Sequence, residues 1–390
     1  MFSRNLLQRF GICNKSKEFI KIKSRFYWIS VTGKELRILG IESSCDDSAA
    51  AVVTSSGNIL SHVVKSQNSI HAEYGGIVPI VATEHHTSNM PFVIKEALAK
   101  SGTSITDLDA IAVTRGPGLP SSLAVGLNAA KTLAAVHDKP LIGVHHMEAH
   151  ALVARLGNPS VAEFPFLCLL ISGGHTMLVV VNDINSHTIL GTTLDESIGN
   201  CFDKVSRHLL IPKSDSKIPF GECLEITAKS GNPARFDLPV PLSKSDSANS
   251  LDYSFTGLKS FITRYIDEKK LDVSNPVDVA DMAASFQYTA TKHLISKVKK
   301  GYKKVVSSGI PVKSFVVSGG AARNNYIRDQ LELFCRENNL KLALPPHFLC
   351  SDNGVMIAWA GIERFNRGLF DDYGISIKQR WPLDQLGKSE

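Results

Sequence analysis

Two histidines spaced four residues apart are the first side chains in this sequence whose pattern indicates chemistry. The segment reads His146-Met147-Glu148-Ala149-His150. On a helix, residues i and i+4 share a face, so both imidazoles can bind a single metal ion. Taken alone, such a pair is more often part of a polar helix face without metal. Glu148 does not directly follow His146, so this is not the HExxH motif of zinc proteases.

Glycine-rich turns form the second group of candidate functional residues. Ser172-Gly173-Gly174-His175-Thr176 stands between two apolar runs, and its backbone N–H groups suit a phosphate or carboxylate. The alternative is an ordinary hairpin turn. Ser318–Asn324 follows another apolar run and precedes a helical pattern, the arrangement in which a helix N-terminus meets a nucleotide. With the Arg115–Gly118 loop, these turns favour a nucleotide-binding protein.

Asp352 is the remaining acidic candidate. It lies in Cys350-Ser351-Asp352-Asn353-Gly354, just before the apolar run 355–360. A Ser or Asp at this place is normally the N-cap of the following helix. Only in combination with His146 and His150 does Asp352 become a candidate third metal ligand. His145, by contrast, is expected to point elsewhere and to have a structural role or to support a metal ligand from behind.

The elements that position these residues repeat along the chain. Strands are expected at 37–41 and 49–54, with a third strand after the turn at 55–58. The same strand–turn–strand opening returns at 164–200. Further expected segments are helices at 84–101, 121–137, 145–156 and 324–338, strands at 110–114, 141–144 and 315–317, and loops with short helices at 212–260. Two such units predict a duplicated α/β architecture.

Composition limits the class of protein. At 390 residues the chain is long enough for two lobes, and 43% hydrophobic with 21% charged residues is typical of a globular protein. No apolar stretch approaches the roughly 20 residues that span a bilayer, so no membrane association is expected. The seven cysteines form no CxxC pair, which excludes a zinc ribbon and favours reduced thiols.

Residues 1–34 differ from the rest in charge. They carry eight basic side chains against one acid, Glu18, a net charge of +7, so residues 35–390 sum to −1. Basic, acid-poor and dotted with apolar residues, this segment predicts a mitochondrial presequence cleaved near residues 26–34. A basic tail that binds nucleic acid is the alternative.

Eight motifs follow one another along the chain: Ile41–Asp46, Arg115–Gly118, His146–His150, Ser172–Thr176, Cys201–Lys204, Tyr253–Lys259, Ser318–Asn324 and Ser351–Gly354. In this order they resemble the motifs of one family, the universal tRNA N6-adenosine threonylcarbamoyltransferases, once described as O-sialoglycoprotein endopeptidases. The resemblance covers roughly residues 36–375, and the leader favours the mitochondrial branch.

The resemblance implies roles for individual residues. Metal ligands fall on His146, His150 and Asp352, for one Fe or Zn ion per chain. The acidic position implicated in the family's chemistry falls on Asp46. Adenylate-binding positions fall on Leu170, Ile171, Ser172, Gly173, Gly174, Asp203, Gly221 and Asn324. Phe220-Gly221 stands where Gly-Gly is usual, which makes the Gly221 contact less certain.

The implied fold is the two-lobed, duplicated actin-like/sugar-kinase/heat-shock ATPase fold. Its first lobe is expected over 35–150 with a C-terminal helix at about 352–375, and its second over 151–351 with inserted loops at about 205–260. The implied reaction transfers threonylcarbamoyl from threonylcarbamoyl-AMP, supplied by a separate synthase, to the adenosine 3′ of the anticodon in mitochondrial tRNAs. The resemblance also favours a homodimer in the mitochondrial matrix.

Three alternatives stay open at this stage: a sugar kinase or ATPase of the same fold, a metalloprotease, and a non-catalytic assembly subunit that binds nucleotide. A lysine-rich stretch is the best candidate for tRNA contact, although the solvated face of a helix would look the same. Its members are Lys292, Lys297, Lys299, Lys300, Lys303 and Lys304.

Overall fold

The computed structural model describes residues 35–74, 76–213, 218–243 and 249–387. The predicted presequence, residues 1–34, lies outside the described residues. Among the described residues, no helix has both the length and the apolar character needed to cross a bilayer.

Two five-stranded sheets with the same strand order form the framework. The first has the order β3-β2-β1-β4-β5 and the second β8-β7-β6-β9-β10. In each, the first three strands along the chain pair antiparallel and the last two join in parallel. The expected duplication is therefore confirmed. The strands are β1 (Arg37–Glu42), β2 (Asp47–Thr54), β3 (Ile59–Ser66), β4 (Ala110–Gly116), β5 (Leu141–His145), β6 (Phe166–Ile171), β7 (Thr176–Asp183), β8 (Ser186–Thr192), β9 (Ser314–Ser318) and β10 (Lys341–Ala343).

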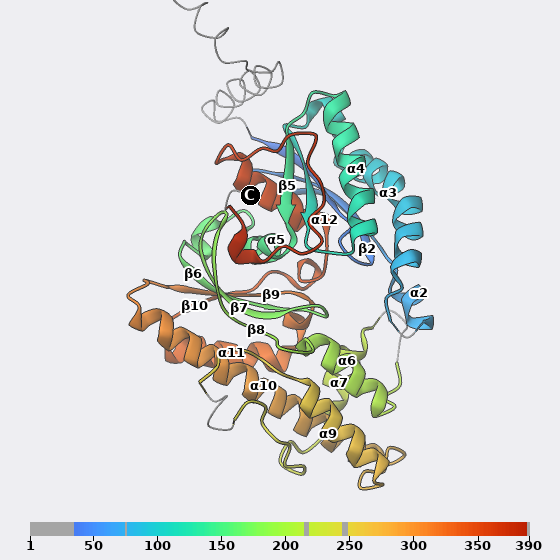
Figure 1. Ribbon diagram of the computed structural model, residues 1–390, viewed down its shortest axis with the longest axis vertical. Helices are drawn as coiled ribbons and strands as arrows, with labels where there is room; N and C mark the ends of the chain where they lie inside the picture. The colour runs from blue at the N-terminus through green and yellow to red at the C-terminus, as the bar shows by residue number, and fades with distance from the viewer. Residues whose placement is uncertain (1–34, 75, 214–217, 244–248, 388–390) are drawn as a thin grey trace, which may run out of the picture.

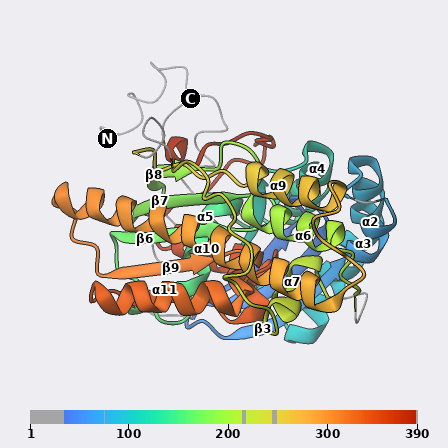
Figure 2. The same ribbon diagram turned by 90° about the horizontal axis from the view of Figure 1, so that it is seen from below.

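Helices cover both sheets and also separate them (Figure 1). Those of the first half are α2 (Asn68–Glu73), α3 (Pro79–Ser101), α4 (Pro120–Val136) and α5 (His146–Leu152). Those that follow are α6 (Ile198–His208), α7 (Phe220–Ala228), α9 (Thr256–Asp267), α10 (Pro276–Ser307), α11 (Asn325–Glu337) and α12 (Gly354–Phe365). Figure 2 shows α10 and α11 running along the side of the second sheet that faces away from the first half.

The central strands are buried on both faces, which explains their nearly continuous apolar sequences. In β6, Leu167, Leu169 and Ile171 face the core beneath α6 and α10, whereas Cys168 and Leu170 face the core between the two sheets. That middle core also receives α5 and α12. A third core joins α3 and α4 to the outer face of the first sheet. Each sheet thus supplies one face to the layer that holds α5.

Two expectations differ from the structure. The helix expected at 84–101 begins at Pro79, because Pro is well tolerated in the first turn of a helix. Lys297, grouped with the exposed lysines, is buried at 1% exposure, and its Nζ donates to the carbonyl of Ser250 at 2.7 Å. Its position on α10 faces inward, so it does not belong to a basic surface. Lys292, Lys299, Lys300, Lys303 and Lys304 are exposed.

Candidate metal and nucleotide site

The helix α5 begins where β5 ends, in the layer between the sheets. His145 caps it, its Nδ1 accepting a hydrogen bond from the N–H of Met147 at 3.1 Å, while its Nε2 meets the carbonyl of Trp381 at 2.9 Å. The expected structural role of His145 fits these contacts. All seven residues of α5 are buried. A histidine pair on such a helix is therefore not a solvated polar face.

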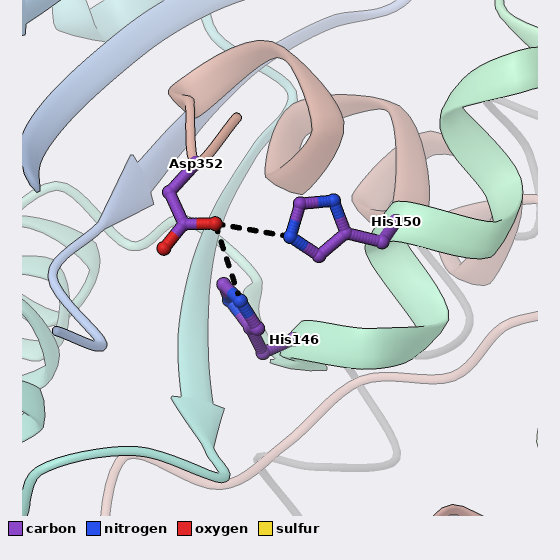
Figure 3. A group of neighbouring side chains, drawn as sticks. All are labelled: His146, His150 and Asp352. Carbon is purple, nitrogen blue, oxygen red and sulfur yellow. Dashed lines mark hydrogen bonds and ion pairs between the residues drawn. The ribbon is translucent and has the colours of Figure 1, made fainter. Parts of the chain in front are cut away.

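Asp352 comes from the other end of the chain to meet the two histidines (Figure 3). Its Oδ1 lies 3.0 Å from Nε2 of His150 and 3.4 Å from Nε2 of His146. The N-cap interpretation of Asp352 is wrong, because Asn353 caps α12 by accepting from the N–H of Met356 at 2.8 Å. With the cap provided by its neighbour, the Asp352 carboxylate is free to face His146 and His150.

These three side chains fit a metal ion. One ligand atom from each lies within 4.8 Å of the others, and two imidazole nitrogens with one carboxylate oxygen are donors that Zn and Fe accept. The Nδ1 atom of His150 is buried without a hydrogen-bond partner among the described residues. Glu148 points elsewhere, toward Arg364 and Asn185, so it offers no general base beside the metal ligands.

The electrostatics of the cluster keep Asp352 ionised. Burial raises the pKa of its carboxyl, but the charges and hydrogen bonds of His146 and His150 outweigh this and hold the pKa well below its usual value. For His146, burial lowers the pKa, and the carboxylates of Asp352 and Glu42 reverse this and raise it well above the ordinary value. The cluster of Asp352 and Glu42 carboxylates therefore favours a positive charge, which a metal cation would supply.

Glu42 is a further residue of the candidate site, one to which the sequence analysis assigned no role. It ends β1, is fully buried, and its Oε2 lies 3.2 Å from Nδ1 of His146. Thr114 donates to the same carboxylate, and the Ser44 hydroxyl lies 3.3 Å from the His146 ring. A carboxylate on the far nitrogen fixes the ring and its tautomer, as in many metal sites. The sequence signal that could have identified Glu42 is its position as an acidic residue at the end of an otherwise apolar strand.

Replacing Glu42 with Gln is expected to weaken metal binding about 10- to 100-fold, because His146 loses the carboxylate that orients it. The change preserves side-chain size within the buried end of β1. Competition with a chelating dye would measure the dissociation constant of the metal. The matched control is Glu96→Gln on the exposed part of α3, and unchanged affinity in Glu42→Gln would exclude the supporting role.

Asp46 lies in the turn between β1 and β2, on the approach to the cluster. Burial, and then the charge of Asp352, raise the pKa of Asp46 to about 6. Burial and the charge of Asp46 likewise raise the pKa of Asp47 to about 8. Three carboxyl groups thus sit close enough to oppose one another's ionisation, and the pKa of Asp46 approaches neutrality.

The glycine-rich turn between β6 and β7 faces open space. A Cβ added at Gly173 or Gly174 would meet no atom within 4 Å, and both residues are exposed. Leu170 and Ile171, by contrast, lie inside β6 with fully buried side chains, so only their backbone can contact a ligand. Burial and the charges of His146 and His150 lower the pKa of His175 to about 4, so the turn adjoins the histidine cluster.

The other nucleotide candidates gather around the start of α6 and α7. Ser197 caps α6 and donates to the carbonyl of Gly173 at 2.6 Å. Further along α6, Asp203 accepts from the N–H of Gly221 at 2.6 Å. Burial raises the pKa of Asp203. Its contact ties α6 to the N-terminus of α7.

Asn324 reaches the same region from β9 and α11. It caps α11 through the N–H of Ile327 at 3.0 Å, and its amide donates to Gln287 of α10 at 3.0 Å. Its neighbour Arg323 pairs with Glu222 of α7 at 3.2 Å. The structure therefore brings Asp203, Gly221 and Asn324 to one side of the second sheet, next to the 172–174 turn.

Residues 58–359 match the family model described as tRNA N6-adenosine threonylcarbamoyltransferase. The chain belongs to this family. The match includes every residue assigned to metal and nucleotide above, whereas the site residues of β1 and the turn after it, Glu42 and Asp46 among them, lie before its first residue. The family resemblance inferred from the eight motifs is thereby confirmed.

Curated relatives agree with this assignment over nearly the whole chain. The tRNA N6-adenosine threonylcarbamoyltransferase of Methylocapsa acidiphila is 44% identical over 353 residues, 90% of this chain and 97% of the relative. A relative from Arabidopsis thaliana, whose name places it in the mitochondrion, is 41% identical over 378 residues, 91% of this chain and 77% of the relative.

A solved structure supports the fold of this family member. T. kodakarensis HypF aligns with a TM-score of 0.52 at 15% identity, covering 86% of this chain and 47% of that protein. With the duplicated sheets, the fold is the two-lobed actin-like/sugar-kinase/heat-shock ATPase fold, as the sequence predicted.

Proposed function

We propose that this transferase family member transfers threonylcarbamoyl from threonylcarbamoyl-AMP to N6 of the adenosine 3′ of the anticodon in mitochondrial tRNAs. One observation supports the proposal: the donor set of His146, His150 and Asp352 lies near an open glycine turn, and that turn is bonded through Ser197 to α6, the helix that carries Asp203. A metal that holds the acyl end and a cradle that holds the adenylate would then meet at one turn.

His146, His150 and Asp352 would hold one Fe or Zn ion. When bound, such an ion supplies Lewis acidity, which polarises a substrate oxygen. Glu42 fixes the His146 ring from behind, at 3.2 Å from Nδ1. This donor set supports the proposed metal dependence of the reaction.

The chain's own groups would do the remaining work. The turn at Gly173 and Gly174 can bring backbone N–H groups near developing negative charge because no side chain fills the space. The second carboxylate oxygen of Asp203 can accept from a ribose hydroxyl, since Gly221 occupies only Oδ1. Asn324 keeps one amide hydrogen beyond its bond to Gln287. Positioning an adenine amine, a poor nucleophile, supplies much of the rate.

Asp46 is the proposed proton acceptor. A general base works best when its pKa lies near the working pH, and the pKa of Asp46, raised to about 6 by burial and Asp352, meets this condition. Its position between β1 and β2 supports an approach of the adenine amine from the first lobe.

The proposal extends to partners and compartment. The adenylate would come from a separate synthase, the leader would direct import into the mitochondrial matrix, and the chain would act as a homodimer. Exposed lysines on α10, Lys292, Lys299, Lys300, Lys303 and Lys304, are the proposed tRNA contact. Lys299 also pairs with Glu337 at 3.3 Å, which weakens its share of that contact.

Mixing the purified chain with preformed threonylcarbamoyl-AMP and an unmodified tRNA should yield threonylcarbamoyladenosine without an added protein. Nucleoside mass spectrometry measures the product. Asp203→Ala and Asn324→Ala should each raise KM for the adenylate at least about tenfold, because each removes one hydrogen bond to it.

The controls separate the alternatives. Lys303→Glu with Lys304→Glu should raise KM for tRNA and leave KM for the adenylate unchanged. Product that appears only with an accessory subunit would contradict the claim that the chain acts alone. No product under any condition, with ATP hydrolysis or sugar phosphorylation instead, would favour a kinase or ATPase.

A further inference from the structure

A buried histidine of α3, His86, contacts the segment that carries Asp46. Helix α3 packs against β2 on the outer face of the first sheet, and Figure 1 shows the two side by side. The side chain of His86 is fully buried, and both of its ring nitrogens have partners. Nδ1 lies 2.7 Å from the Ser48 hydroxyl, and Nε2 lies 3.0 Å from the carbonyl oxygen of Cys45. The ring therefore joins the two ends of the segment 45–48, with Asp46 between them.

These two contacts define which nitrogen of His86 carries the hydrogen. A carbonyl oxygen can only accept, so Nε2 donates to the Cys45 carbonyl and Nδ1 has no hydrogen. The Ser48 hydroxyl then donates to Nδ1. Burial lowers the pKa of His86, which keeps the ring neutral and in this one tautomer. A neutral ring of fixed tautomer holds both partners at once.

The next carbonyl of the turn is held from the same helix. The backbone N–H of Gln67 donates to the carbonyl of Asp46 at 3.1 Å. Gln67 is fully buried as well, and its side-chain amide donates to the carbonyl of Ala82 on α3 at 3.3 Å. Two successive carbonyls, those of Cys45 and Asp46, are thus tied to α3, the first by His86 directly and the second through Gln67.

The start of α4 holds the residue before them. The backbone N–H of Leu119 donates to the carbonyl of Ser44 at 2.8 Å. Three consecutive carbonyls, from Ser44 to Asp46, therefore have hydrogen-bond donors from outside the turn. Of these three donors, His86 alone is a side chain, so a substitution can remove it and leave the backbone donors unchanged.

We propose that His86 is a positioning residue of the transfer reaction, which holds Asp46 in place by bonding to both ends of the segment 45–48. The inference rests on the proposed function, in which Asp46 accepts the proton. A general base must lie within hydrogen-bond reach of the proton that it takes, and a displacement of about 1 Å can cost about a hundredfold in rate. His86 acts through the turn and takes no proton itself.

Replacing His86 with Leu removes both bonds and keeps a buried side chain of similar size. We expect kcat for threonylcarbamoyl transfer to fall at least about tenfold, because Asp46 loses its fixed position. KM for threonylcarbamoyl-AMP should not change, since the residues proposed for the adenylate lie beside the second sheet. His86→Gln, whose amide offers both a donor and an acceptor, should recover most of the rate. His137→Leu, at the exposed end of α4, is the matched control and should act as the natural chain does.

Alkylation of Cys45 measures the position of the turn independently of the reaction. Of the six cysteines that the structure describes, Cys45 alone is partly exposed, and the others are buried. Burial and the charge of Asp46 raise the pKa of the Cys45 thiol. Only the thiolate reacts, so a released turn that lowers this pKa by about one unit makes Cys45 react with iodoacetamide about tenfold faster. Peptide mass spectrometry of metal-loaded His86→Leu follows each cysteine separately, and the buried ones report any general loosening of the fold.

The two measurements distinguish this inference from the proposed function. If the natural chain forms no threonylcarbamoyladenosine, the proposed function fails, and the alkylation rates still decide whether His86 holds the turn. If the natural chain is active, an unchanged kcat and an unchanged Cys45 rate in His86→Leu would overturn the inference alone. Equal acceleration at all six described cysteines, or no recovery in His86→Gln, would also overturn it, because His86 would then serve only general packing.

Discussion

Replacing Asp352 with Ala is expected to reduce the metal content from one ion per chain to nearly none and to lower the transfer rate roughly a thousandfold. Within the described part of the chain, Asp352 alone supplies a carboxylate oxygen close to both imidazole Nε2 atoms, at 3.0 and 3.4 Å. A metal's electrostatic contribution to a transition state amounts to several kcal/mol, and each 1.36 kcal/mol is about tenfold in rate. His150→Ala should have the same effect.

The fold should survive the Asp352→Ala substitution. Asn353, and not Asp352, caps α12, and the Asp352 side chain is 23% exposed. Elemental analysis and circular dichroism of the same samples would measure metal content and fold together. Asp267→Ala, an exposed acid at the end of α9, is the matched control. Full metal occupancy in both Asp352→Ala and His150→Ala would place the metal elsewhere.

Local sequence patterns were enough to predict most of the fold. Alternating short strands and polar turns at 37–66 and 166–192 predicted two copies of one unit, and both sheets have the same strand order. The spacing of four residues correctly predicted that His146 and His150 lie on one face of α5, because residues i and i+4 of a helix lie one above the other. Such features depend on neighbours in sequence, which a single chain displays directly.

Contacts between segments that are distant in the chain could not be predicted from the sequence. Nothing local distinguishes Asp352 from Asn353 as the cap of α12; the choice depends on α5, some 200 residues earlier. Glu42 acquires its role only when β1 and α5 meet. Lys297 looks like its lysine neighbours, but α10 turns it toward Ser250 and away from solvent. In each case the role of the side chain depends on tertiary packing, which local sequence does not reveal.

Adding one methyl group at Gly40 is expected to lower the free energy of unfolding by about 3 kcal/mol or more and to weaken metal binding as well. Gly40 lies in β1, directly beneath α12. A Cβ there would stand 2.2 Å from the carbonyl oxygen of Gly354 and 2.3 Å from the N of Ala358. Both are backbone atoms, so no side chain can rotate away, and overpacking of this kind costs about 1–3 kcal/mol or more.

The metal site should respond because a single residue, Asn353, separates Asp352 from the start of α12. Displacing the start of α12 moves this carboxylate relative to His146 and His150, which α5 holds from the other side of the core. Chemical denaturation of Gly40→Ala would measure stability, and a metal titration of the still-folded protein would measure affinity. Gly257→Ala is the control: its Cβ would meet nothing within 4 Å, so stability should be unchanged or higher by up to about 1 kcal/mol. If Gly40→Ala kept both its unfolding midpoint and its metal affinity, the close contact of β1 with α12 would not be what positions Asp352.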